Sequence, residues 1–85
     1  MKTFEHVIKD AQGIHARPAG LLVKEIKKHE STVMVAKNGK AVEGRKLMAL
    51  MGLGIKCGET VTITVEGSDE ETAASALETF FTENL

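Results

Sequence analysis

The sequence predicts an α+β fold in which one antiparallel sheet carries its helices on a single face. Strand-like and helix-like segments follow one another in the order βαββαβα. Residues 60–66 alternate between one apolar and one polar face, which is typical of a sheet that is covered on one side only. An Asn38-Gly39 pair between two short apolar segments predicts a tight hairpin. We therefore expect four antiparallel strands and three helices.

Length and composition indicate one small domain. The chain has 85 residues, so we expect residues 1–85 to form a single domain. No apolar run reaches the roughly 20 residues that a membrane span needs, and the first residues lack a signal peptide, so we expect a cytoplasmic protein without membrane insertion. Eleven basic and twelve acidic residues, with no Trp or Tyr, argue against nucleic-acid binding. The single Cys57 cannot form an internal disulfide, and we assign it no chemistry.

The first strand and the first helix are predicted from short patterns. Residues 4–8 alternate imperfectly and favour a strand. A helix is expected to begin at Ala16 or Arg17, because Pro18 fits a first helical turn, where its missing N–H costs nothing. His29 is expected in the last turn or just beyond it. The apolar positions of this helix have the spacing of a buried stripe: Ala19, Leu22, Val23 and Ile26.

The remaining elements are predicted in the same way. Residues 32–37 and 40–43 form the two strands of the hairpin, and residues 47–51 form a short apolar helix that Gly52 or Gly54 ends. The run Ser68-Asp69-Glu70-Glu71 matches a capping box at the start of a last helix. The buried stripe of that helix is expected to contain Ala73, Ala76, Leu77, Phe80 and Leu85, with Ala74 and Phe81 beside it.

His15 is the most informative candidate for chemistry, because it lies at the predicted start of the first helix. Unpaired N–H groups and the helix dipole stabilise an anion there, and a phosphate suits that place. The dipole and Arg17 are expected to disfavour the protonated ring, which leaves a neutral nitrogen able to attack phosphorus. Local chemistry alone leaves a second interpretation open, in which His15 is an exposed residue near a helix cap.

The segment Gly13-Ile14-His15-Ala16-Arg17-Pro18-Ala19 resembles the active-site signature of the HPr family, the histidine-containing phosphocarriers of the bacterial sugar phosphotransferase system. The resemblance extends over essentially all 85 residues and includes segments 38–40, 47–54 and 67–70. It implies an open-faced β-sandwich with three helices over a four-stranded antiparallel sheet. It also implies that Nδ1 of His15 accepts a phosphoryl group from phosphorylated enzyme I and passes it to the A component of a sugar permease. Arg17 would stabilise the charged intermediate.

A carrier of this kind is not an enzyme with its own substrate pocket, and we expect neither a cofactor nor a metal. It docks two partners in turn, so an exposed apolar patch beside the reactive group is expected. Helical stripes are usually buried, but the family's docking surface favours exposure here. The expected docking residues are Ala16, Gly20, Leu21, Leu47, Met48 and Met51. Arg17, Lys24 and Lys27 would steer acidic partners, but for the two lysines alone a solvated helix face is the favoured explanation.

Several residues narrow the function or leave it open. In many Gram-positive members of the family the position of Lys46 is a serine that a kinase phosphorylates, and Lys46 has no hydroxyl to modify. His6 and His29 lack ligands at metal-binding spacing, so we treat both as structural or solvent-facing. We expect a monomer, because the docking patch must stay free. A regulatory relative of the nitrogen-related phosphotransferase branch, or a module that binds partners without covalent chemistry, remains open at this point.

Overall fold

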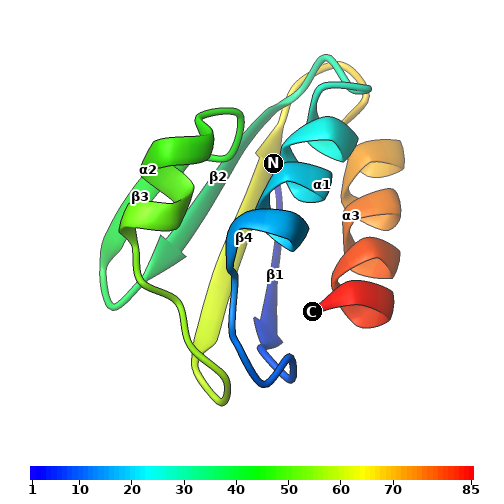
Figure 1. The fold of residues 1–85 in the computed structure, drawn as a ribbon. Helices are drawn as coiled ribbons and strands as arrows, with labels where there is room; N and C mark the ends of the chain where they lie inside the picture. Colours follow the sequence, from blue (N-terminus) through cyan, green and yellow to red (C-terminus); the bar gives the residue numbers. More distant parts are fainter.

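Four strands form one antiparallel sheet in the order β1-β4-β2-β3, and all three helices lie on the same face of it (Figure 1). The computed structural model describes residues 1–85. The elements follow the expected βαββαβα order: β1 Lys2–Val7, α1 Ala16–Ile26, β2 Thr32–Lys37, β3 Lys40–Glu43, α2 Leu47–Gly52, β4 Thr60–Glu66 and α3 Glu70–Asn84. The expected architecture is therefore confirmed.

The central strand β4 separates the buried face of the sheet from the open face. Val61, Ile63 and Val65 are fully buried against the helices, whereas the intervening threonines lie on the uncovered face. Ile63 pairs with Phe4 of β1 on one side and with Val35 of β2 on the other. This alternation is what the period of two predicts, because successive side chains of a strand point to opposite faces.

The hairpin and the end of α2 have the predicted backbone conformations. Asn38 has φ +51° and Gly39 has φ +80°, so both occupy the left-handed region that a type I′ turn requires. Gly54, with φ +62°, follows α2 in the same region, and Gly52 is the last helical residue. Positive φ at these positions sets the direction in which the chain leaves each element.

The first strand begins earlier than its sequence pattern indicates. β1 pairs with β4 from Lys2 to Val7, and Ile8, which we expected inside the strand, follows it. The main-chain N–H of Ile8 still donates to Glu59 O at 2.9 Å, and the side chain of Ile8 is buried. The pairing partner on β4 therefore determines the start of the strand, and the apolar pattern alone does not.

The buried face of α3 differs from the predicted one. Ala73, Ala74, Leu77, Phe81 and Leu85 are buried, whereas Ala76 and Phe80 are only half-buried. Phe81 packs edge-on against two residues of β1, with ring-centroid distances of 5.9 Å to Phe4 and 5.4 Å to His6. This contact turns the helix so that Phe81, and not Phe80, faces the sheet.

The predicted capping box at Ser68 is wrong. The N-cap residue of α3 is Asp69, and its carboxylate makes no bond within the helix. The Asp69 carboxylate instead accepts hydrogen bonds from the main-chain N–H groups of Glu30 and Ser31, both at 2.9 Å, and from the Ser31 hydroxyl. Ser68 donates to Glu30 at 3.2 Å. Tertiary contacts with the loop before β2 therefore replace the local pattern.

None of the helices combines the length and the apolar character that a membrane crossing requires.

Candidate functional site

The loop before α1 holds His15 at a fixed place. Ile14 is buried, and its N–H donates to Ile55 O at 3.0 Å. Gly13 has φ +69°, and any side chain at this position would collide with the carbonyl of Ile55. A glycine is therefore required for the loop to lie this close to the chain after α2. His15 is the next residue after this contact, so the contact fixes where its backbone begins.

His15 is the N-cap residue of α1, with an extended backbone (φ −100°, ψ −176°) and no capping hydrogen bond from its side chain. Its side chain is 37% exposed, so a partner in solution can reach the ring. Nε2 lies 3.7 Å from Oδ1 of Asp10, and the same Oδ1 accepts the main-chain N–H of Gln12 at 2.9 Å. The ring therefore has one nitrogen turned toward a carboxylate, a neighbour that the sequence did not reveal.

The first turn of α1 leaves two main-chain donors free. The N–H groups of Ala16 and Arg17 donate to no protein acceptor, Pro18 has no N–H, and the N–H of Ala19 bonds to His15 O at 2.9 Å. The first turn contains no acidic residue. Free N–H groups at the positive end of a helix dipole bind anions, so a phosphate attached to His15 would lie where they can stabilise it.

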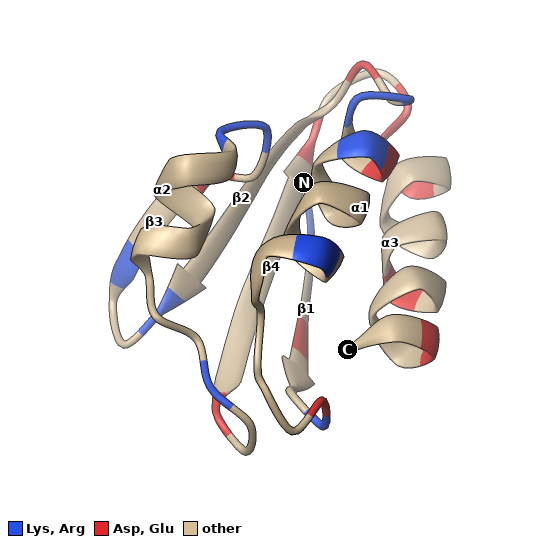
Figure 2. Cartoon of the chain, in the orientation of Figure 1, with Lys and Arg blue, Asp and Glu red and all other residues tan.

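The basic residues of α1 are not neutralised within the molecule. Arg17, Lys24 and Lys27 are exposed and take part in no ion pair. Figure 2 shows basic positions along α1 and only acidic ones along α3. The exposed face of α1 therefore presents positive charge that is not paired within the molecule.

Apolar side chains are exposed on the two helices near this charge. Exposed fractions are 77% for Met48, 38% for Leu47 and 45% for Leu21, while Met51 is half-buried. α1 and α2 pack against each other, and Figure 1 shows them side by side. Leu50 alone among the residues of α2 is fully buried. The other expected docking positions are an exposed Ala16 and a half-buried Gly20.

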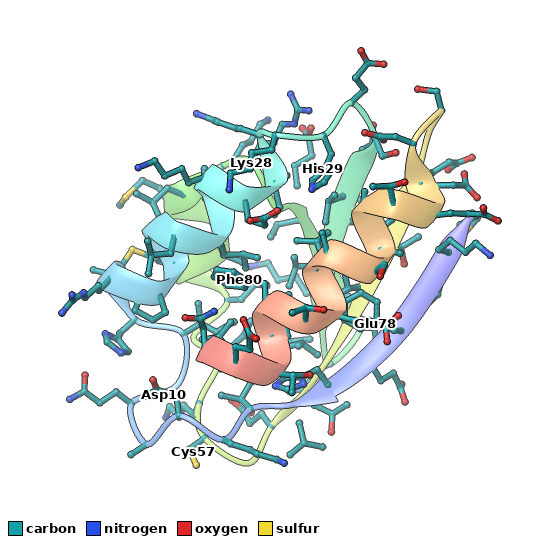
Figure 3. The ribbon with its side chains drawn as sticks, turned by 90° about the vertical axis from the view of Figure 1, so that its right-hand side faces the viewer. Asp10, Lys28, His29, Cys57, Glu78 and Phe80 are labelled. Atoms are coloured by element: carbon teal, nitrogen blue, oxygen red, sulfur yellow. The ribbon has the colours of Figure 1, made fainter.

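His29 has neighbours that the sequence analysis did not foresee. Its Nε2 lies 3.2 Å from Glu25 and its Nδ1 lies 3.8 Å from Asp69, next to the start of α3 (Figure 3). Glu25 lies four residues before His29, so a carboxylate at helical spacing was present in the sequence, although we expected no such neighbour at ligand spacing. Partial burial raises the pKa of Glu25, but hydrogen bonds from His29 and Lys28 outweigh it and hold this pKa below its usual range. No cluster of three or more potential metal ligands forms here or elsewhere.

The other residues singled out from the sequence lie apart from this arrangement. The ring of His6 packs against Phe81, and Lys46 is exposed, with its Nζ 3.4 Å from the Glu43 carboxylate. Cys57 is exposed and lies with Asp10 at one end of the molecule (Figure 3). Its Sγ is 3.8 Å from Lys9 O.

Comparisons with known proteins find relatives of this chain over its whole length. A family model described as "PTS HPr component phosphorylation site" matches residues 2–83. The chain is 44% identical over 87 residues to the phosphocarrier protein HPr of Mycoplasma genitalium, and the match covers 99% of this chain and 97% of the relative. Relatives named phosphocarriers are thus similar to the chain over its whole length.

Solved structures show the same similarity. A crystal structure of HPr-C-His from Thermoanaerobacter tengcongensis superposes with a TM-score of 0.88 at 40% identity, and the match covers 100% of both chains. A crystal structure of an HPr dimer from the same bacterium gives a TM-score of 0.77 at 38% identity, covering 98% of this chain and 95% of the other. Fold and sequence point to one family.

Proposed function

The chain belongs to the HPr family, the phosphocarrier proteins of the phosphotransferase system, and from this premise we propose that His15 is the residue that carries the phosphoryl group. Proteins of this family are phosphocarriers and not enzymes. Because a phosphocarrier binds the phosphoryl group covalently, family membership argues against a module that binds partners without covalent chemistry. One observation supports the assignment above the others. The accessible ring of His15 adjoins two main-chain N–H groups, at Ala16 and Arg17, that have no acceptor of their own.

The chemistry proposed for His15 is a transfer between two imidazole rings. Nδ1 attacks the phosphorus of a phosphohistidine on enzyme I, and the donor's P–N bond breaks while its ring nitrogen takes the electron pair. Positive charge develops on the His15 ring, and the Asp10 carboxylate, 3.7 Å from Nε2, stabilises it. The N–H groups of Ala16 and Arg17 and the Arg17 guanidinium stabilise the phosphoryl oxygens. In the transfer to the A component of a sugar permease, His15 is the donor. A nucleophile of that partner attacks the phosphorus, and the P–N bond to His15 breaks.

The docking surface proposed for both partners lies on α1 and α2. Met48, Leu47 and Leu21 are exposed there, and methionine adapts to surfaces of different shape. Arg17, Lys24 and Lys27 carry unpaired positive charge, which accelerates association with acidic partners and weakens as salt is added. The remaining members of the proposed surface are Ala16, Gly20 and Met51.

We further propose that the protein acts as one domain, residues 1–85, in the cytoplasm and as a monomer. Two different partners must reach the same face of α1 and α2 in turn, and a permanent dimer through that face would block both. Light scattering after size exclusion should give the mass of one chain. A stable dimer that loses its interface on Met48→Glu would contradict the monomer.

The test of the proposal is phosphorylation by enzyme I and phosphoenolpyruvate, followed by intact mass spectrometry. The wild-type chain should gain one acid-labile phosphoryl group, and His15→Ala should gain none. His29→Gln is the matched control, because it removes another partly exposed imidazole while leaving the start of α1 intact, and it should be phosphorylated normally. A phosphoryl group on His15→Ala would show that the assigned residue is wrong.

A further inference from the structure

Lys37 differs from the other basic residues of the chain. Of the eleven Lys and Arg residues it alone is not exposed, and its side chain is only 15% accessible. Its ammonium group lies 3.3 Å from Leu53 O, 2.9 Å from Gly54 O and 2.9 Å from Oε1 of Glu59. An ammonium group has three donors, and each has an acceptor here. Lys37 is therefore held in one position, unlike a solvated lysine.

The three acceptors lie at the two ends of one segment, residues 53–59. Leu53 and Gly54 follow α2, where the helix dipole favours a cation, and Glu59 precedes β4. The Glu59 carboxylate also accepts the main-chain N–H of Lys56 at 2.7 Å. The hydrogen bond from Lys37, with that from Lys56, holds the pKa of Glu59 below its usual range, so the carboxylate stays charged beside the ammonium. Lys37 thus ties the beginning of the segment to its end.

The same segment supports the loop that carries His15. Ile55 O accepts the N–H of Ile14 at 3.0 Å, one residue before His15. Gly58 N donates to Ile8 O at 2.7 Å, and Ile8 N donates to Glu59 O at 2.9 Å. Three main-chain hydrogen bonds therefore join segment 53–59 to residues 8–14, and a shift of this segment is transmitted to the backbone of His15.

We propose that Lys37 is a positioning residue for phosphoryl transfer, which fixes segment 53–59 and through it the ring of His15 against the start of α1. The inference rests on the proposed role of His15. Transfer requires in-line geometry at phosphorus, and a displacement of about 1 Å can slow a reaction by as much as 100-fold. Lys37 touches no reacting atom, so its effect should fall on the rate within the complex and not on docking.

The test compares Lys37→Met with Lys40→Met. Methionine keeps the length of the side chain but removes the ammonium group, which leaves Leu53 O and Gly54 O without this donor and Glu59 with only the N–H of Lys56. Lys40 lies opposite Lys37 in the hairpin, is exposed and takes part in no ion pair, so its substitution removes the same charge without those contacts. In rapid-quench assays with phosphorylated enzyme I, Lys37→Met should lower the maximal rate of phosphorylation about tenfold with a KM within about twofold of wild type. Lys40→Met should match the wild type.

Two further variants keep the test decisive if Lys37→Met is unstable. Lys37→Arg retains a charged donor within reach of the carbonyls and should recover most of the rate. Glu59→Gln removes one charge but keeps an acceptor, and we expect a fall of about threefold. In NMR spectra, the ring signals of His15 and the amide signal of Ile14 should shift in Lys37→Met and should not shift in Lys40→Met.

Two results would overturn the inference. One is a folded Lys37→Met variant that melts earlier but is phosphorylated at the wild-type maximal rate, since Lys37 would then act on stability alone. The other is an equal loss of rate in Lys40→Met, which would show that net charge is the cause. If the wild-type chain is not phosphorylated, or if His15→Ala is phosphorylated normally, the role of His15 itself is overturned. That result is distinct from the two above.

Discussion

The helices α1 and α3 have the same dipole but use their N-terminal ends in opposite ways. α3 begins with Glu70 and Glu71, whereas the first turn of α1 contains no acidic residue. Glu70 accepts the main-chain N–H of Gly67 at 3.2 Å and pairs with the N-terminal ammonium group at 2.6 Å. At α1 the N–H groups of Ala16 and Arg17 have no partner in the protein. One helix end is neutralised by its own chain, and the other is available to an external anion.

This difference extends along the two helices. α3 has acidic residues and no Lys or Arg, while Arg17 and Lys24 of α1 are exposed and unpaired (Figure 2). α3 also covers the sheet with a continuous buried face, and α1 combines such a face with the exposed Leu21. Groups at the start of α3 are engaged in stabilising contacts, whereas those at the start of α1 are free for the proposed phosphoryl group, so substitutions at the two ends should affect different measurements.

The largest effect is expected when α1 is given the first turn of α3. In Ala16→Glu a carboxylate lies beside the free N–H groups, at an exposed position where the side chain fits. It should compete with the phosphoryl group and repel it, which lowers the rate of phosphorylation by roughly 100-fold. The same carboxylate complements the helix dipole and should stabilise the fold by about 0.3–1 kcal/mol. Rapid-quench kinetics and urea unfolding measure the two opposite changes.

Ala16→Gln is the control for this prediction, since it has nearly the same shape without the charge. It should keep most of the rate and gain little stability. Equal losses of rate in the two variants would mean that the size of the side chain, and not the electrostatic field at the start of α1, limits transfer.

The next largest effect is expected at the start of α3. Ser31 is fully buried, and its hydroxyl and N–H both donate to Asp69 at the start of α3. Ser31→Ala removes a hydrogen bond to a charged group and should lower the free energy of unfolding by about 1.5–3 kcal/mol. The rate of phosphorylation at 25 °C should not change. Ser68→Ala, at an exposed position, should cost much less, and a loss of transfer in Ser31→Ala would show that the two helix ends are coupled.

The sequence predicted those parts of the molecule that depend on local chemistry. The period of two in β4, the positive φ of Asn38 and Gly39 and the start of α1 near Pro18 were all confirmed, because neighbours in the chain decide them. The segment around His15 also indicated an anion site, since a helix start and a nearby arginine are visible in seven residues.

Contacts between distant segments could not be predicted in this way. The acceptors of Lys37 lie 16, 17 and 22 residues further along the chain, and no pattern in the sequence around Lys37 predicts these contacts. The capping box failed because Asp69 binds the loop before β2, and Phe81 replaced Phe80 on the buried face because β1 packs there. Asp10 is close to His15 in the chain, but the conformation of the intervening turn, which brings the two side chains together, could not be predicted from the residue types alone.

The smallest effect tests the neutralised end of α3 by pH. The N-terminal ammonium group and the N–H of Gly67 hold the pKa of Glu70 below its ordinary value of 4.5. A carboxylate with a lowered pKa contributes stability that is complete above its unfolded value and disappears as the pH falls through the folded one. Glu70→Gln should therefore melt slightly below the wild type at neutral pH, and the difference should vanish as the pH falls below 4.5. Glu71→Gln, whose carboxylate is 82% exposed and 3.5 Å from Lys2, is the matched control and should change the melting temperature little at neutral pH. If Glu70→Gln also slowed phosphorylation, the contrast between the two helix ends would fail, because a group bound at α3 would then be acting on the chemistry at α1.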